Sequence, residues 1–72
     1  MKLSDFKPGD RVVYVPNHAF GDKNHEDSIK GTVSSVNGYC VFVRFDQQVE
    51  KFGWEGTTAQ GCQLRNLEKE RA

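Results

Sequence analysis

Two histidines and several acidic residues lie close together in the first half of the chain, between positions 18 and 27. Imidazole and carboxylate groups are the donors that zinc and other transition ions take from proteins. The candidate ligands are His18, Asp22, His25 and Asp27. Their spacing is neither a His-x-x-x-His helix motif nor a Cys-x-x-Cys pair, and such side chains also brace polar loops by bonding to the loop backbone. We therefore expect no cofactor, with zinc at these four residues as the alternative.

The two cysteines, Cys40 and Cys62, raise the question of nucleophilic catalysis. A cysteine nucleophile needs a histidine within hydrogen-bond distance and usually a third group that orients it. Nothing in the spacing places either cysteine near a histidine. A chain of 72 residues also buries only one modest core, which leaves little room for an enclosed active site. We predict that both cysteines are reduced, small apolar residues and that the protein is not an enzyme.

Four aromatic residues fall in loops or on the face opposite the predicted core: Phe20, Phe42, Phe52 and Trp54. Exposed aromatic side chains are the groups with which small barrels grip bases, peptides or partner proteins. The alternative is a second apolar cluster that closes the ends of the barrel. Together with the polar loop, these aromatics give the predicted binding residues, which are His18, Phe20, Asp22, His25, Phe52 and Trp54.

The charge of the chain is balanced, with ten basic and ten acidic residues and a formal net charge of zero. Proteins that bind a phosphate backbone usually carry a basic excess, so the composition does not favour nucleic acid as the partner. Lys7, Arg11, Lys30 and Arg44 could line up as a basic strip, although acidic neighbours favour a mixed, solvated surface.

No apolar run approaches the roughly 20 residues of a membrane span, and no apolar signal region follows Met1. We expect a cytoplasmic protein.

Strand-like segments dominate the first two thirds of the chain. The β-branched and aromatic residues of 11–15, 29–36 and 39–45 predict three strands. The Asn37-Gly38 pair predicts a tight hairpin between the second and the third, with positive φ at both residues. Alternation in the third strand puts Tyr39, Val41, Val43 and Phe45 on the core face. Residues 17–28 are polar and form a long loop of the kind that is often functional or mobile.

The last third of the chain is harder to assign. We expect residues 46–56 to be irregular, and we find no helix with a full amphipathic period. The remaining assignments are a short strand at 57–60, a turn or single 3₁₀ turn at 61–65, a last strand at 66–68 and a frayed tail at 69–72. Five short strands with glycine-rich turns favour a small barrel, because closure hides the edges of the sheet.

The order of these motifs resembles KOW-type, Tudor-type and other SH3-like barrels. The matching features are the turn and strand of residues 8–15, Gly31-Thr32-Val33, and the run from Val41 to Asp46. The resemblance covers residues 6–46 and supports an all-β fold, a small five-stranded SH3-like barrel. The length of the chain predicts a single domain spanning residues 1–72, with the long polar loop after its first strand. The resemblance says little about function, because such barrels bind RNA, DNA, peptides and proteins.

The chain is also similar to small uncharacterised proteins encoded by bacteriophages and prophages. The shared features are the loop motif His18, Gly21, Asp22 and His25, the Val-Ser-Ser-x-Asn stretch at 33–37, residues 41–45, and Thr58-Ala59-Gln60-Gly61-Cys62. This resemblance implies an accessory protein made in a bacterial cytoplasm. We expect a binding module that contacts a host protein through residues 17–28 and 46–56. The alternatives are a nucleic-acid-binding barrel and an oligomer that sequesters a nucleotide signal against host defence.

Overall fold

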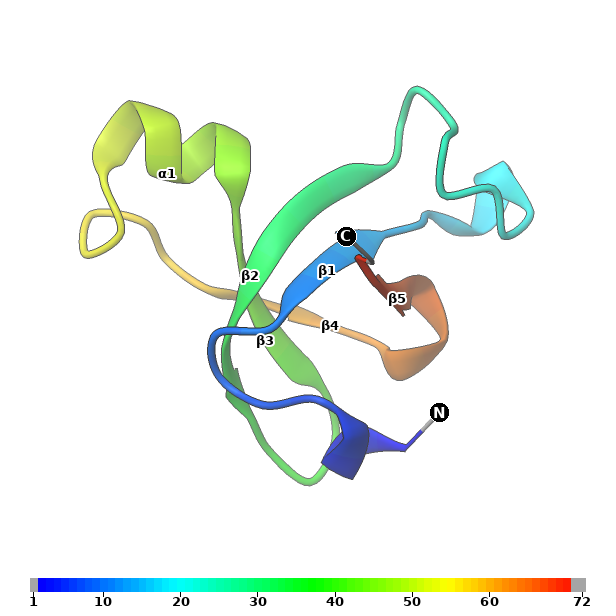
Figure 1. The fold of residues 1–72 in the computed structure, drawn as a ribbon, viewed down its shortest axis with the longest axis horizontal. Helices are drawn as coiled ribbons and strands as arrows, with labels where there is room; N and C mark the ends of the chain where they lie inside the picture. The colour runs from blue at the N-terminus through cyan, green and yellow to red at the C-terminus, as the bar shows by residue number, and fades with distance from the viewer. Residues whose placement is uncertain (1, 71–72) are drawn as a thin grey trace.

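The computed structural model describes residues 2–70 of the chain. It contains one antiparallel sheet of five strands in the order β4-β3-β2-β1-β5, which curls into a half-barrel (Figure 1). The strands are β1 (Arg11–Tyr14), β2 (Ile29–Val36), β3 (Val41–Phe45), β4 (Gln60–Cys62) and β5 (Leu67–Lys69). The prediction of a small all-β, SH3-like fold is confirmed.

The central hairpin joins β2 to β3 through residues 37–40, and its register shifts between Val33 and Ser35. The predicted turn type was wrong, because neither Asn37 nor Gly38 has a positive φ. Instead, the Asn37 side chain accepts hydrogen bonds from the backbone N–H groups of Tyr39 and Cys40, at 2.7 and 2.9 Å. An asparagine that bonds its own turn in this way needs no left-handed backbone.

The core lies inside the curl of the sheet. Its fully buried side chains are Val12, Val33, Val41 and Val43, and Phe6, Phe45, Cys62 and Leu67 pack around them. The core face predicted for β3 is confirmed for Val41, Val43 and Phe45. The prediction was wrong for Tyr39, which is 90% exposed. Tyr39 precedes the first paired residue of β3 and lies in the turn, so the strand alternation does not extend to it.

We predicted that residues 46–56 are irregular. This was wrong for the first part of the segment, because Asp46–Phe52 forms the helix α1. Its seven residues contain no Gly or Pro, and the acidic Asp46 lies in the first turn, where it complements the helix dipole. Gly53 ends the helix with a φ of +80°, a conformation that other residues rarely adopt. Two turns are too short for the apolar periodicity that identifies longer helices.

The C-terminal third contains the predicted kinds of element at shifted positions. The fourth strand is Gln60–Cys62, not 57–60, and the 3₁₀ turn is Leu64–Asn66. Thr57 is buried instead of paired, and its hydroxyl donates to the Gly53 carbonyl at 2.7 Å. The predicted fraying of the tail was wrong for residue 69, which lies in β5, and for Glu70, whose N–H donates to the Arg11 carbonyl at 2.9 Å. Residues 71 and 72 lie outside the described part of the chain.

The segment between β1 and β2 is long and polar, as predicted. After a 3₁₀ turn at Asn17–Ala19, it continues through a series of tight turns to Ser28. Within residues 2–70, no helix has the length and apolar character needed to cross a membrane.

Candidate functional site

The polar loop brings three of its four candidate metal ligands together. His18 Nε2 lies 2.7 Å from Asp27 Oδ2, and His25 Nδ1 lies 4.0 Å from the same oxygen. One ligand atom from each residue lies within 4.8 Å of the other two. The two imidazole rings meet edge to face, with their centroids 5.4 Å apart. The loop therefore presents two nitrogen donors and one oxygen donor at a single point.

Backbone hydrogen bonds fold the loop into this arrangement. The N–H groups of Asp22, His25 and Ser28 each donate to the carbonyl three residues earlier, at 3.0 Å in every case. These successive turns bring the end of the loop back against its start. Asp27 can therefore reach His18, which lies nine positions earlier in the chain.

Asp22, the fourth candidate ligand, has a different role. Its Oδ1 accepts the backbone N–H of Asn24 at 2.9 Å, and its carbonyl accepts the Ser28 hydroxyl at 3.1 Å. Asp22 therefore shapes the turn that carries His25. Of the four candidate ligands, Asp22 is thus the one that does not belong to the converging group.

Phe20 is the most unusual side chain of this loop. It is 94% exposed, and its backbone is left-handed with φ 51° and ψ 42°. Among the described residues it is the one non-glycine residue with a positive φ. Left-handed backbone costs roughly 1–2 kcal/mol for a residue with a Cβ, and the exposed ring contributes no burial in return. Gly21 follows with a φ of +80°, so the two residues together aim the ring into solvent.

A second aromatic group lies at the end of α1. Phe52 and Trp54 are 55% and 41% exposed. The Arg44 guanidinium lies 4.5 Å from the centroid of the Trp54 ring, and Lys51 Nζ lies 5.4 Å from that of Phe52. A cation over an aromatic face favours one orientation of the ring. Both rings are thus exposed but oriented, as the predicted binding role requires.

The two predicted binding segments do not form one continuous patch. In Figure 1 the turn after α1 and the loop of residues 17–28 lie at opposite ends of the molecule, with β1 and β2 between them. Phe42 belongs to neither group, because it is half-buried in β3, where a Cβ on Gly61 would lie 3.4 Å from its ring. A partner that contacts both segments must therefore extend across the molecule, past β1 and β2, from one segment to the other (Figure 1).

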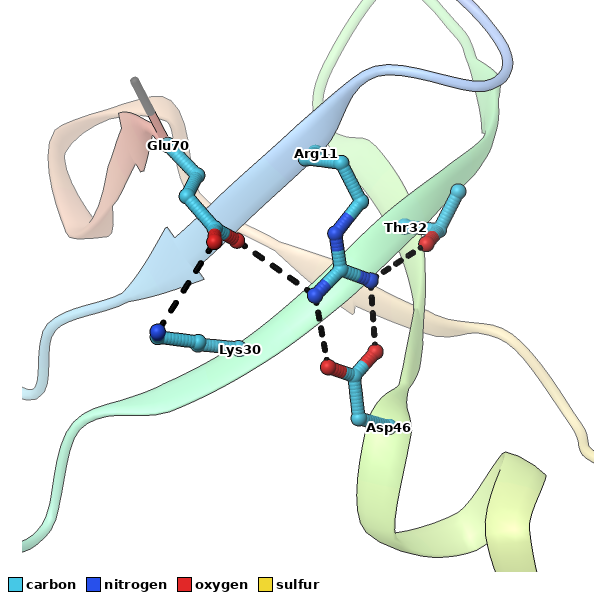
Figure 2. Close-up of polar contacts among 5 residues, drawn as sticks. All are labelled: Arg11, Lys30, Thr32, Asp46 and Glu70. Atoms are coloured by element: carbon cyan, nitrogen blue, oxygen red, sulfur yellow. Dashed lines mark hydrogen bonds and ion pairs between the residues drawn. The ribbon is translucent and has the colours of Figure 1, made fainter. Parts of the chain in front are cut away.

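Acidic residues pair with two members of the predicted basic strip, Arg11 and Lys30. Figure 2 shows the Arg11 guanidinium paired with Asp46 through two hydrogen bonds of 2.6 Å, with Thr32 at 2.8 Å as a further partner. Glu70 lies between Arg11 and Lys30, at 3.3 and 3.7 Å. This network connects β1, β2, the start of α1 and the end of the chain. Around Arg11 and Lys30 the surface therefore carries both signs of charge, as the acidic neighbours indicated.

The Arg11–Asp46 pair predicts a modest loss of stability in acid. The hydrogen bond from Arg11 lowers the pKa of Asp46 more than burial raises it. A carboxyl group whose pKa is lower in the folded state stabilises the fold above its unfolded pKa of about 4. That contribution disappears as the pH falls through the folded pKa. Because both side chains are more than a third exposed, we expect Asp46→Asn to lower the free energy of unfolding by about 0.5–1 kcal/mol at pH 7.

Urea denaturation at pH 7 and at pH 3 measures this effect, and the difference between wild type and Asp46→Asn should shrink at the lower pH. Glu50→Gln, on the same helix and exposed, is the matched control and should have little effect at either pH. A difference of equal size at both pH values would show that the ionised carboxylate is not what stabilises the protein.

The cysteines are free thiols in different environments. Cys62 is buried, as predicted, whereas Cys40 is only half-buried. Burial, with a smaller effect from Cys40, raises the pKa of Cys62 to about 11. Cys62 is therefore a neutral thiol near pH 7, and its Sγ lies 3.6 Å from the Gln60 carbonyl. A catalytic cysteine needs the opposite shift, towards the thiolate.

Asn66, which anchors the loop, was missed by the sequence analysis. It is 8% exposed, and its side-chain amide donates to the Val15 carbonyl at 2.9 Å and to Asn17 Oδ1 at 2.8 Å. Its own carbonyl accepts the Val15 N–H at 2.6 Å. The start of β5 therefore fixes the point where the loop leaves β1. A lone asparagine beside a leucine gives no signal of this role in the sequence.

Comparisons of the chain with protein-family models, with curated proteins and with solved structures found no match.

Proposed function

We propose that this protein is a non-catalytic accessory module of phage type, made in the cytoplasm of a bacterial host, which binds a host protein through residues 17–28 and 46–56. The observation that carries the proposal is Phe20, a fully projecting ring on left-handed backbone. Strained backbone persists in folded proteins mainly where it serves function. An exposed aromatic ring is a typical anchor for a pocket on a partner protein.

The charge of the two segments indicates the kind of partner. Residues 17–28 contain three acidic residues and one lysine, a net charge of −2, and residues 46–56 have the same balance. Electrostatic complementarity across an interface therefore favours a partner with a basic surface. The same negative charge disfavours a nucleic-acid backbone, although Arg44 beside Trp54 could stack on a base.

Recovery of the partner from host lysate tests the proposal. We expect Phe20→Gly and the double variant Phe52→Ala/Trp54→Ala each to recover a given host protein at least about tenfold less than wild type, because exposed aromatic anchors contribute most of the affinity. Tyr39→Ala is the matched control. Tyr39 is an aromatic residue about as exposed as Phe20. It lies in the β2–β3 turn, at the other end of the sheet from both segments (Figure 1).

Three results would count against host-protein binding. One is equal recovery by all variants, and another is an equal loss in Tyr39→Ala. The third is a partner that disappears with nuclease or whose affinity falls steeply with salt, since this would indicate nucleic acid.

Phe20 also allows a prediction that needs no partner. Phe20→Gly removes the left-handed strain of roughly 1–2 kcal/mol and adds the backbone entropy of glycine, about 0.5–1 kcal/mol. We expect the free energy of unfolding to stay the same or rise by up to about 1 kcal/mol. In Tyr39→Gly, where φ is not positive, only the entropy cost applies and stability should fall. Urea denaturation compares the two variants, and a clear loss in Phe20→Gly would show that the ring stabilises the fold.

A further inference from the structure

We infer that His18, His25 and Asp27 form a site for one divalent transition ion of the zinc class, with water in the remaining coordination position. This inference does not depend on the proposed partner, because it concerns the isolated chain. The starting observation is the convergence of two imidazoles and one carboxylate from the long polar loop of residues 17–28.

The separations of the donor atoms suit such an ion. A tetrahedral ion with bonds of about 2.0–2.1 Å places its ligand atoms roughly 3.3 Å apart. In the structure His18 Nε2 and His25 Nδ1 lie 2.7 and 4.0 Å from Asp27 Oδ2, which brackets that distance. Small rotations of exposed side chains are enough to equalise the two separations.

The hydrogen bonds of the cluster indicate how an ion would enter. The Asp27 N–H donates to His25 Nδ1 at 3.0 Å, so this nitrogen carries a lone pair, the form in which histidine binds metals. On binding, the ion would replace the Asp27 N–H as the partner of His25 Nδ1. His18 Nε2 and Asp27 Oδ2 lie 2.7 Å apart, so an ion bound between them would replace a hydrogen bond.

The donor set and the charge select the class of ion. Calcium and magnesium prefer oxygen ligands alone, whereas two imidazoles with one carboxylate suit zinc and its neighbours in the transition series. A divalent ion would also offset the net charge of −2 in residues 17–28. The His18–Asp27 pair by itself braces the loop only weakly, because these side chains are 62% and 56% exposed.

The exposure of the cluster leaves one side of the ion open. Three protein ligands and one water is the arrangement in which zinc keeps an exchangeable position. The same position is open to a ligand from another molecule. The ion would join the two ends of the loop, since His18 lies near its start and Asp27 near its end, and it would hold Phe20 between them.

Isothermal titration of the full chain with Zn²⁺ alone, after treatment with a chelator, tests the site. We expect one ion per chain with a dissociation constant on the order of micromolar or tighter, and no measurable heat with Mg²⁺ or Ca²⁺. Amide NMR shifts should be confined to residues 17–28 and their neighbours. Absence of Zn²⁺ binding, or equal binding of Ca²⁺, would overturn the inference.

Three variants and two matched controls identify the ligands. His18→Ala, His25→Ala and Asp27→Asn should each weaken Zn²⁺ binding on the order of 100-fold, whereas Asp22→Asn and Glu26→Gln should bind like wild type. Asn at position 22 keeps the oxygen that accepts the Asn24 N–H, so the loop is preserved. Circular dichroism confirms that each variant is folded. Equal losses in the two controls would reduce the site to general attraction by negative charge and would refute it.

Discussion

Gly31→Ala is expected to lower the free energy of unfolding by about 2 kcal/mol. Gly31 is buried in the middle of β2, where it pairs with Val12 and with Phe45. An added Cβ would lie 2.6 Å from Val43 Cγ1 and 2.9 Å from the Arg44 carbonyl oxygen. That oxygen belongs to the backbone of the paired strand β3, so it cannot move aside freely.

The expected size follows from two opposing effects. Overpacking a well-packed core costs about 1–3 kcal/mol, and contacts of 2.6 and 2.9 Å place Gly31→Ala near the upper end of that range. The smaller entropy of the unfolded chain with alanine returns about 0.4–1 kcal/mol. A domain below about 80 residues rarely has more than 3–5 kcal/mol of stability. A net loss of about 2 kcal/mol would therefore remove a large share of the stability of the protein. Urea denaturation followed by circular dichroism measures it.

Gly38→Ala is the matched control for this prediction. Gly38 lies in the β2–β3 turn without a positive φ, and an added Cβ would meet no atom within 4 Å. Stability should stay the same or rise by up to about 1 kcal/mol. If Gly31→Ala were as stable as this control, the packing of β2 against β3 would have to be looser than described.

Asn66→Ala should lower the free energy of unfolding by about 2–3 kcal/mol. The side-chain amide of Asn66 makes two hydrogen bonds, to the Val15 carbonyl and to Asn17 Oδ1. Truncation leaves the Val15 oxygen without this donor in a buried place, and an unsatisfied buried group costs more than a hydrogen bond contributes. The bonds also hold the end of β1 to the start of β5, so their loss should loosen the loop of residues 17–28.

Two measurements separate the anchoring role from a general loss of stability. Hydrogen exchange should accelerate in the amides of 17–28 at denaturant concentrations where the β2–β3 hairpin stays protected. Asn17→Ala removes only the exposed acceptor and should cost no more than about 1 kcal/mol. If Asn66→Ala had only this smaller effect, the Val15 carbonyl would be satisfied in another way, and the anchor would not exist.

The fold was largely predictable because its strands are local and regular in composition. Composition identified β2, and alternation in residues 39–45 identified β3 with the core residues Val41, Val43 and Phe45. Prediction failed where the elements are short. The seven residues of α1 and the three of β4 contain too few positions for a period to emerge, and tertiary contacts decide their conformation.

The candidate site was predictable in composition but not in geometry. The sequence showed that His18, His25 and Asp27 share a polar loop, but it also offered Asp22 on equal terms. The structure separates them, because Asp22 bonds the backbone of the next turn while Asp27 reaches His18. For Phe20, too, the sequence indicated the residue but not its geometry. Its left-handed backbone follows from no rule of composition.

By itself, the sequence determined the class of the fold, the core face of β3 and the position of the long polar loop. These features depend on near neighbours and on the two-residue period of strands, which a sequence displays directly. Only the tertiary structure decided which charges pair, which asparagine anchors the loop and which ligands meet. Arg11 with Asp46 and Asn66 with Val15 are contacts across 35 and 51 positions. These residues meet because the curl of the sheet and the pairing of β1 with β2 and β5 bring distant segments together.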